Sequence, residues 1–408
     1  MRGRMKRVFQ ISLFLFVFAF QTGCSGQAGS QVQDRDTNSN EVSFESGSIP
    51  ALHMPRVVSA VDTSPGWNQR GEKLLLTGTV YKPDGKTPMP GVLIYYYQTN
   101  TAGKYVHNPK ETRSMPPNDL GQTHGYIRGW VRSDANGKYS VYTVRPGTYP
   151  TNDEPAHIHL TVRDPGIVKE YYIDDVVFDD DKLLTTAKRT KMENRGGSGV
   201  LRMVKKGSLF VGERNIILGL NIPDYPDSNT GDLQSGKSIG EDVFSFTPFH
   251  AWGPDKGTKT CPICKYGWYH GILYFAGNNP DWAQIRQWLN FLESESNKRE
   301  KYLKVYFVYG NESGYDRSQR ENELAQVGQE LQLNKVALTF VPSFKDKDSD
   351  IHLNKINPET ENTFILYRRS RIIDKHINLK PNEENFALIA GRLDQTINEY
   401  FYLEKDKE

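Results

Sequence analysis

The sequence predicts a protein of two folded parts, an all-β antiparallel sandwich followed by an α/β domain. Short runs rich in Val, Ile, Leu, Tyr and Thr, separated by Gly, Pro, Asn and Asp turns, fill residues 66–226 and are typical of antiparallel strands. In residues 241–408 the apolar spacing alternates between the periods of strands and helices. A chain of 408 residues has room for both parts.

The expected elements follow from these periodicities in chain order. In the first part we expect strands at 74–81, 92–98, 127–133, 139–143, 158–163 and 215–222. In the second part we expect strands at 272–276, 303–309, 336–341, 363–367 and 372–375, and helices at 281–293, 319–331 and 385–400. The helix at 281–293 is amphipathic, since Trp282, Ile285, Trp288, Leu289 and Leu292 fall on one side.

The start of the chain predicts export. Residues 1–23 read as a signal peptide, with basic residues before an apolar stretch at 8–20 that is too short for a comfortable membrane span. Cys24 then resembles the lipidated first residue of a bacterial lipoprotein. Gln21 replaces the usual leucine, so cleavage with simple secretion is the alternative. We therefore expect a cell-envelope protein, held to a membrane by a lipid on Cys24 or secreted.

Two polar segments separate these parts. Residues 24–65 predict a flexible tether, and residues 227–240 predict a linker rich in Pro, Gly, Asp and Ser. The formal net charge of +2 argues against a nucleic-acid partner or a charged surface anchor. The sequence leaves the oligomeric state open.

Four residues form a candidate metal site. His157 and His159 alternate within Pro155-Ala156-His157-Ile158-His159, so on a strand both imidazoles leave the same face. Tyr149 lies shortly before them in a turn-forming segment, and Tyr105 follows another turn. A lone His-x-His pair is more often two ordinary surface or core imidazoles, and tyrosine is common here, with 22 in the chain.

Two phenols and two imidazoles suit ferric iron. A tyrosine loses its proton only near pH 10 unless a strong cation offsets the cost, and a hard trivalent ion does this best. Two phenolates and one hydroxide would neutralise Fe(3+), which suits a partly buried site. Zinc would ordinarily recruit cysteines, carboxylates or a third histidine.

The surrounding motifs resemble a known family, the intradiol ring-cleavage dioxygenases, over about residues 70–226. In chain order, the motifs are Thr77-Gly78-Thr79-Val80-Tyr81, Pro90-Gly91-Val92, Tyr97-Gln98-Thr99-Asn100, Gly103-Lys104-Tyr105, Arg128-Gly129-Trp130, Ser133-Asp134-Ala135-Asn136-Gly137-Lys138-Tyr139, the run from Thr143 to Pro150, and the histidine motif at 155–159. Several ordered motifs at family-like spacing are more specific than any one of them.

The resemblance implies an activity and residue roles. Tyr105 and His157 would be equatorial ligands of Fe(3+), and Tyr149 and His159 axial ligands. The substrates would be a small aromatic diol of catechol type and O2, and the product a muconate-type dicarboxylic acid. Tyr149 would leave the metal and take up a substrate proton, which makes it the candidate catalytic base.

One position departs from the family pattern. Glu154 stands three positions before His157, where members with established catalysis usually carry an arginine. A carboxylate near a bound catecholate would repel it, whereas a guanidinium would stabilise its charge. Arg145 and Arg163 are the nearby arginines that we considered as substitutes. Iron binding is therefore better supported by the sequence than turnover.

An alternative reading makes the first part a binding module. The motifs at 77–81 and 90–92 also resemble transthyretin-like and peptidase-associated sandwiches, which bind sugars or partners at a cell surface. On this alternative the chain would be a non-catalytic cell-envelope lipoprotein. The two readings differ in whether Tyr105 and Tyr149 reach the histidines.

The second part resembles the thioredoxin fold but not its active site. Cys261-Pro262-Ile263-Cys264 precedes the strand at 272–276, whereas in thioredoxins the cysteine pair follows the first core strand. The proline expected before the strand at 363–367 is absent too. We expect a structural disulfide between Cys261 and Cys264 in an oxidising envelope. Redox exchange, and a metal site of these cysteines with His250 and His270, are the alternatives.

Overall fold

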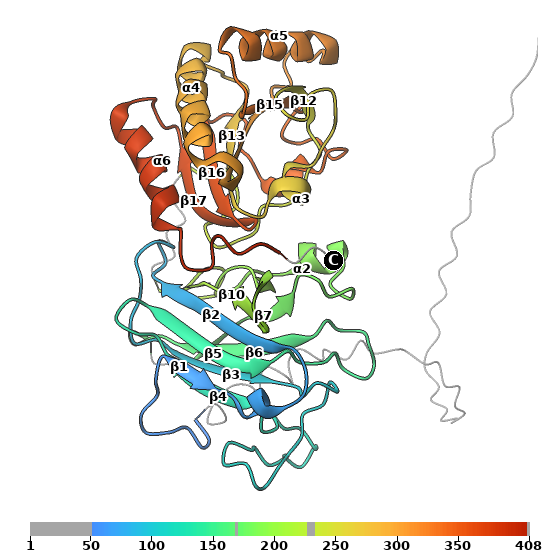
Figure 1. Cartoon of the computed structure of the whole chain (residues 1–408), viewed down its shortest axis with the longest axis vertical. Helices are drawn as coiled ribbons and strands as arrows, with labels where there is room; N and C mark the ends of the chain where they lie inside the picture. Colours follow the sequence, from blue (N-terminus) through green and yellow to red (C-terminus); the bar gives the residue numbers. More distant parts are fainter. Residues whose placement is uncertain (1–50, 168–169, 227–232, 406–408) are drawn as a thin grey trace, which may run out of the picture. The chain divides into compact units, whose positions relative to one another are not determined.

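The computed structural model describes residues 51–167, 170–226 and 233–405. They lie in the unit Glu45–Glu408, one of the two into which the chain divides, and Figure 1 colours them from blue to red along the sequence. The other unit, Met1–Phe44, lies outside the described residues, and with it the predicted signal peptide and Cys24. Among the helices that are described, none has both the length and the apolar character needed to cross a bilayer.

Two sheets form the first part. One has the strand order β1 (Val61–Thr63), β5 (Lys138–Val144), β2 (Lys73–Tyr81), β10 (Leu209–Glu213) and β9 (Met203–Lys206), with β11 (Ile216–Ile217) pairing beside β2. The other has the order β4 (Arg128–Arg132), β3 (Leu93–Gln98), β6 (His157–Arg163), β7 (Tyr171–Phe178) and β8 (Val200–Leu201). The helix α2 (Thr186–Lys191) lies between β7 and β8, and the 3-10 turn η1 (Pro65–Asn68) follows β1.

A hydrophobic core packs between the two sheets and fixes which faces remain outside. Alternate residues of β6 enter this core, among them Ile158 and Leu160, each 1% exposed. Leu74 and Leu76 of β2 enter it from the other sheet. Because side chains alternate along a strand, His157 and His159, the residues that alternate with Ile158 and Leu160, face away from the core. This alternation places the histidine motif on the outer face of the β4-β3-β6-β7-β8 sheet.

The expected all-antiparallel pairing is only partly right. The central pairs are antiparallel, but β1 with β5, β2 with β10 and with β11, and β7 with β8 are parallel. Parallel neighbours need a long connection, and here more than a hundred residues separate β2 from β10. Local periodicity cannot reveal such distant pairings, so the sandwich is mixed.

The strand predictions largely match the structure, and the segment boundaries differ in three places. β1 falls in the range expected to be tether, because its residues pair with β5. The range 215–222 holds only β11, since Gly219 adopts a φ of +75° and turns the chain. Residues 233–240, expected to be linker, pack on the second part: Ser235 is buried and its Oγ lies 2.6 Å from Thr363 Oγ1.

The second part is built on one mixed sheet. Its strand order is β12 (Phe249–Trp252), β15 (Ala337–Phe340), β14 (Leu303–Tyr309), β13 (His270–Ala276), β16 (Thr363–Arg368) and β17 (Arg371–Ile377). Its helices are α3 (Pro262–Tyr266), α4 (Trp282–Arg299), α5 (Arg317–Glu330) and α6 (Glu383–Gln395), with 3-10 turns η2 (Glu300–Tyr302) and η3 (Ile351–Asn354). Asp281, Asp316 and Asn382 cap α4, α5 and α6.

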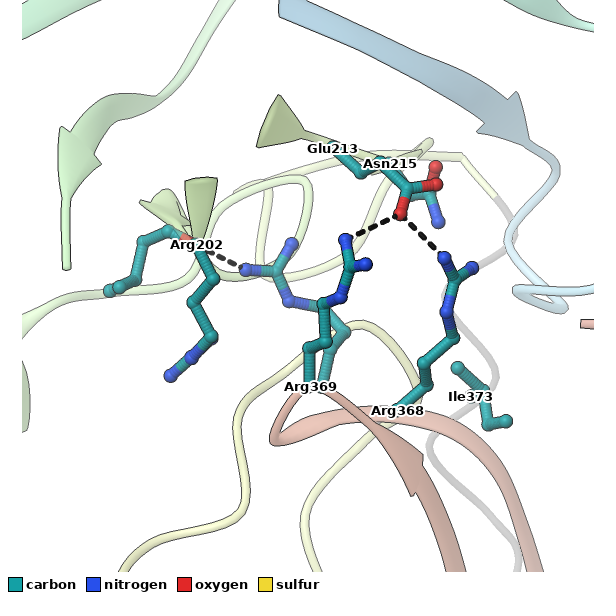
Figure 2. A pocket seen from close by; sticks show the side chains of 8 residues that line it. Arg202, Glu213, Asn215, Arg368, Arg369 and Ile373 are labelled. Atoms are coloured by element: carbon teal, nitrogen blue, oxygen red, sulfur yellow. Dashed lines mark hydrogen bonds and ion pairs between the residues drawn. The ribbon is translucent and has the colours of Figure 1, made fainter. Parts of the chain in front are cut away.

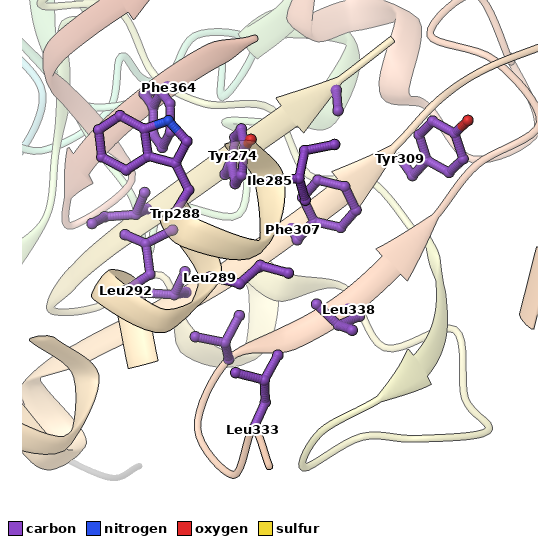
Figure 3. Close-up of a cluster of buried hydrophobic side chains, with 14 of the residues drawn as sticks. Tyr274, Ile285, Trp288, Leu289, Leu292, Phe307, Tyr309, Leu333, Leu338 and Phe364 are labelled. Atoms are coloured by element: carbon purple, nitrogen blue, oxygen red, sulfur yellow. The ribbon is translucent and has the colours of Figure 1, made fainter. Parts of the chain in front are cut away.

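The amphipathic face expected for the helix at 281–293 is buried in the structure. Trp288 and Leu289 of α4 are fully buried, and Figure 3 shows Trp288 beside Phe364 of the sheet, with ring centroids 4.6 Å apart. This core is distinct from the one between the sandwich sheets. The thioredoxin-like assignment of this part stays a prediction.

Candidate metal centre

Strand β6 presents the two histidines. His157 and His159 lie on the face of β6 opposite to the buried Ile158 and Leu160. On the same outer face, Tyr97 of β3 pairs with His159 across the strands, and its ring stacks on the imidazole with centroids 4.3 Å apart. The stack holds the His159 ring upright on the sheet.

Two glycine turns bring the tyrosines to the histidines. The turn before Tyr105 contains Gly103, whose φ is +71° and whose added Cβ would lie 1.6 Å from the Thr148 carbonyl oxygen. The turn before Tyr149 contains Gly147, whose amide donates to the Asn100 carbonyl at 3.0 Å. The two turns therefore pack backbone against backbone, which fixes the separation of the two phenols.

Four donor atoms close into a ring, which we call the donor ring. Tyr105 Oη lies 3.1 Å from Tyr149 Oη, and Tyr149 Oη lies 3.0 Å from His157 Nε2. His157 Nε2 lies 3.1 Å from His159 Nε2, which lies 2.9 Å from Tyr105 Oη. Residues more than fifty positions apart in the chain thus place all four donor atoms around one point.

The protons of the two imidazoles indicate that this point suits a cation. His157 Nδ1 donates to the Pro155 carbonyl at 2.8 Å, and His159 Nδ1 lies 2.9 Å from the Asp175 carboxylate. Both acceptors require the proton on Nδ1, which leaves a lone pair on each Nε2. Two lone pairs that face each other at 3.1 Å repel unless a positive charge lies between them.

The size of the donor ring fits a metal ion. Metal bonds to nitrogen and oxygen of about 2.0–2.2 Å that meet at right angles hold their donor atoms about 3 Å apart. The four edges of the ring measure 2.9–3.1 Å. The residues present therefore fit a bound metal, both in donor type and in spacing.

Electrostatics keeps the ligands in the state that a metal requires. Burial, and then the neighbouring His159, lower the pKa of His157, so this imidazole is neutral near pH 7. Burial acts to raise the pKa of Asp175, but His159 more than offsets it and the net pKa is lowered. Asp175 therefore stays a carboxylate and holds the Nδ1 proton of His159.

Asp175 and Tyr172 were missed by the sequence analysis. The Tyr172 hydroxyl donates to Asp175 Oδ1, the oxygen that also faces His159. Among the residues described, His157, His159 and Asp175 form the one group of three His, Cys, Asp or Glu side chains close enough to share a metal ion. Asp175 contacts the Nδ1 side of His159 and not the Nε2 side. We therefore infer that Asp175 orients the His159 ring and is not a metal ligand. Neither residue carries a local signal, because the strand β7 was not predicted.

A third histidine, His124, lies behind the stack of Tyr97 and His159. His124 packs on the other face of the sheet aromatics, with its ring 3.7 Å from that of Tyr97, and its Nδ1 lies 2.7 Å from Tyr95 Oη. Burial, followed by repulsion from His159 and Arg128, lowers the pKa of His124 to about 3. His124 is therefore a neutral member of the aromatic support and not one of the four donors.

Arg145 and Arg163 are the candidate replacements for the arginine whose position Glu154 occupies, and each is paired with a carboxylate outside the donor ring. Glu154 is exposed. Arg145 forms a bidentate pair with Asp180 at 2.8 and 2.9 Å and also contacts Glu72. Arg163 is half-exposed and lies 3.8 Å from Glu170. Both guanidinium groups are thus engaged with carboxylates of their own.

Within the described part of the chain, Cys261, Cys264, His250 and His270 do not form the alternative metal site. Cys261 and Cys264 are joined in a disulfide, with Cα atoms 5.4 Å apart, and Cys261 caps the short helix α3. His250 Nε2 donates to the Thr260 carbonyl at 2.8 Å, and His270 Nε2 lies 2.9 Å from Thr396 Oγ1. The expected order also holds, since the cysteine pair precedes β13.

The part of the chain that contains the donor ring is similar to known dioxygenases. Residues 57–195 match a family model described as Dioxygenase. The protocatechuate 3,4-dioxygenase beta chain of Burkholderia cepacia is 35% identical over 98 residues, covering 22% of this chain and 39% of that protein. Catechol 1,2-dioxygenase of Acinetobacter baylyi is 30% identical over 136 residues, covering 29% and 41%. The chain thus spans about two fifths of the length of these relatives.

A solved structure also aligns with the chain. The dioxygenase domain of a dioxygenase and carbohydrate-binding protein fusion from Streptomyces sp. SirexAA-E is 20% identical over 40% of this chain and 92% of that chain, with a TM-score of 0.28. The family assignment rests on the sequence matches. They confirm the resemblance expected from the ordered motifs: residues 57–195 are similar in sequence to the intradiol ring-cleavage dioxygenases.

Proposed function

We propose that the chain binds ferric iron in the donor ring and cleaves the ring of a catechol-type aromatic with O2. The observation that carries the proposal is the closure of Tyr105, Tyr149, His157 and His159 around one point, with edges of 2.9–3.1 Å. The product would be a muconate-type dicarboxylic acid.

The choice of ferric iron rests on the charge of the donor ring. Its two phenols need a hard, highly charged ion to lose their protons near neutral pH, and its two imidazoles would bind the ion as neutral ligands. The phenolates would leave one positive charge on Fe(3+), which a hydroxide or a substrate oxygen would balance. When bound, ferric iron would act as a Lewis acid toward both oxygens of a catechol and would accept electron density from it.

The chain itself would bind and deprotonate the diol. Tyr105 and Tyr149 both lie on connections between strands, whereas both histidines lie within β6. The resemblance to the intradiol dioxygenases selects the phenol of Tyr149. Its oxygen contacts both Tyr105 and His157. We assign Tyr149 as the base whose phenolate oxygen takes a proton from a hydroxyl of the diol.

The overall reaction balances without a further reductant. The carbon–carbon bond between the two hydroxyl-bearing carbons breaks, and both atoms of O2 enter the product as the new carboxyl oxygens. The diol supplies four electrons and O2 accepts them. Two protons leave as the carboxylic acids ionise at neutral pH.

Glu154 is the residue that we expect to limit the rate at which the chain turns over catechol. A carboxylate close to a catecholate repels it by about 1 kcal/mol or more at intermediate dielectric. Arg145 and Arg163 are engaged with Asp180 and Glu170. We therefore expect slow turnover of plain catechol, and faster turnover once an arginine replaces Glu154.

We also propose that the protein is exported and held to a membrane of the cell envelope by a lipid on Cys24. The support is the basic and apolar pattern of residues 1–23 directly before this cysteine. Mass spectrometry of the mature amino terminus tests it. A diacylglyceryl adduct on Cys24 is the expected result, and an unmodified residue at this position would contradict it.

Oxygen uptake tests the proposed reaction. Iron-loaded protein is offered catechol, a substituted catechol and hydroxyquinol, and O2 consumption is followed together with the ultraviolet absorption of the ring-opened acid. Uptake and product in a one-to-one ratio are expected, with loss of both in Tyr149→Phe and a gain in Glu154→Arg. If iron binds but neither the native chain nor Glu154→Arg consumes O2, the first part is a binding module.

A further inference from the structure

A small cavity lies between the sandwich and the α/β part. It measures about 50 Å³, and Figure 2 shows the side chains around it. Four arginines line it, one from the sandwich and three from the β16–β17 hairpin, and we call them the interface arginine cluster. They are Arg202, Arg368, Arg369 and Arg371, and Glu213 of β10 lies among them.

Three carboxylates lie within ion-pair distance of these four cations: Glu213, Asp242 and, at 3.9 Å from Arg202, Asp179. Glu213 accepts from Arg368 at 2.7 Å and from Arg369 at 3.3 Å, and both contacts are drawn in Figure 2. Asp242 accepts from Arg202 at 2.9 Å and from Arg371 at 3.1 Å. Asp179 is shared with Arg189, which it contacts at 2.8 Å. With Arg189 counted, five guanidinium groups face three carboxylates, which leaves an excess of two positive charges.

The excess charge is buried. The four guanidinium side chains are only 7–13% exposed. Burial, and then repulsion from Arg368, lower the pKa of Arg369 to about 10, and the pKa of Arg371 is lowered as well. An arginine side chain keeps its charge at neutral pH even with such a shift. Buried like charges without a counter-charge are costly, which calls for an explanation of the cluster.

Unfilled hydrogen-bond donors point to the same cavity. Among the residues described, the Nε atoms of Arg368 and Arg369 are buried and have no hydrogen-bond acceptor. Their terminal nitrogens donate to Glu213, to the Thr396 carbonyl and to the Tyr400 carbonyl. Buried N–H groups are nearly always satisfied in proteins, so two open donors side by side indicate a missing acceptor.

The hairpin that carries three of the arginines has an unusual backbone. Arg368 pairs with Arg371, and the two residues between them form the turn. Arg369 has a φ of +49° and Ser370 a φ of +63°. A two-residue hairpin of this kind normally uses Asn and Gly, because side chains with a Cβ resist positive φ. Keeping arginine at such a position costs stability and marks a candidate functional segment.

We propose that this cavity binds one compact oxyanion. The missing acceptor, the two uncompensated positive charges and the position of the hairpin all converge on it. A space of this size holds roughly three or four waters, or one tetrahedral oxyanion or carboxylate group. Planar guanidinium groups donate in pairs to oxyanions, so they select them over a spherical chloride ion. Since both parts of the chain supply ligands, bound anion holds them together.

Sulfate is the probe of choice, because phosphate is also a hard oxygen ligand for a trivalent metal at the donor ring. Sulfate is titrated into the full chain by calorimetry at fixed ionic strength, with chloride as the second arm. One site per chain is expected for sulfate, together with a rise in thermal midpoint that chloride does not reproduce. Absence of sulfate binding, or equal effects of the two anions, would overturn the proposal.

Variants locate the site. Arg369→Gln removes one guanidinium and should weaken sulfate binding at least about tenfold, since a charge-assisted hydrogen bond is lost. Arg286→Gln, at an exposed arginine on α4 paired with Glu330, is the matched control and should leave binding unchanged. If Arg369→Gln does not fold, Arg368→Lys keeps the charge but not the planar fork and should also weaken sulfate. Native-like sulfate affinity in a folded variant of the cluster would contradict the assignment.

Discussion

Two places in the molecule gather groups that repel one another, the donor ring and the interface arginine cluster. The donor ring brings two imidazole lone pairs within 3.1 Å, together with two phenol oxygens. The interface arginine cluster brings four guanidinium groups together around Glu213 and Asp242, with Asp179 at 3.9 Å from Arg202 and shared with Arg189. Each arrangement is costly by itself, and each becomes favourable with a partner of opposite character, a cation in the first case and an anion in the second.

The two places differ in how the chain builds them. The donor ring depends on the alternation of one strand and on two glycine turns, which are local devices that a sequence displays. The interface arginine cluster joins residues that are more than 150 positions apart, from Arg202 to Arg368, and exists only where two parts of the chain meet. A site of local origin can be predicted from motifs, whereas a site made by docking requires the structure.

Removing a donor should have the largest effect. His157→Ala deletes one nitrogen of the donor ring, and we expect ferric affinity to fall by more than about 100-fold, beyond the usual cost of losing a supporting residue. Competition with a chelator measures it. His53→Ala, at an exposed histidine, is the control and should bind iron normally. Unchanged affinity in His157→Ala would remove the donor ring as the iron site.

Removing a counter-charge tests the other cluster. Asp242→Asn removes the carboxylate that Arg371 contacts and leaves Arg202 with only Asp179, at 3.9 Å. We expect a loss of about 3–5 kcal/mol in the free energy of unfolding. Denaturant titration measures it. A loss below about 1 kcal/mol, as for an exposed ion pair, would mean that the cluster is not a buried charge centre.

The stability difference between the native chain and Asp242→Asn should depend on pH, because the pKa of Asp242 is shifted in the folded chain. Burial acts to raise the pKa of Asp242, but Arg202 and Arg371 more than offset it, so its pKa lies below the usual value. Such a carboxyl stabilises the fold above its unfolded pKa of about 3.9, and the contribution is lost as pH falls through the folded value. The stability gap between native chain and Asp242→Asn should therefore shrink below about pH 4.

The glycine turns can be tested with a matched pair. Gly103→Ala places a Cβ 1.6 Å from the Thr148 carbonyl oxygen at a positive φ, so we expect a loss of about 2–4 kcal/mol in stability and weaker iron binding. Gly121→Ala has a similar φ of +77° but nothing within 4 Å, and should cost about 1 kcal/mol with normal iron binding. Equal losses in the two variants would show that the turn contact does not matter.

Changing Asp175, which supports the His159 ring, should have the smallest effect of the four substitutions. Asp175→Asn keeps the shape of the side chain but removes the charge that holds the Nδ1 proton of His159. We expect ferric affinity to fall about 10- to 100-fold, with all four donors still in place. Tyr172→Phe should give a smaller loss in the same assay, since it removes one hydrogen bond to that carboxylate. A loss as large as that of His157→Ala would mean that Asp175 itself binds the metal.

The sequence predicts the four donors because each follows from a local rule. His157 and His159 share a face through the period of a strand, and Tyr105 and Tyr149 follow turns. The ordered strands at 74–81 and 92–98 are also found, as β2 and β3.

What the sequence does not predict depends on distant partners. Asp175 reaches His159 only because β7 pairs with β6, and β1 forms only because β5 lies beside it. The parallel neighbours of β2 come from residues more than a hundred positions later. These features need the assembled sheets, since nothing in the local apolar pattern specifies the pairing.

Ferric titration followed by visible absorption tests the central claim most directly. If Tyr105 and Tyr149 bind iron as phenolates, one equivalent of Fe(3+) should produce a charge-transfer band that saturates at one iron per chain, and Tyr149→Phe should weaken or shift it. A native chain that stays colourless, or a band that Tyr149→Phe leaves unchanged, would contradict the account.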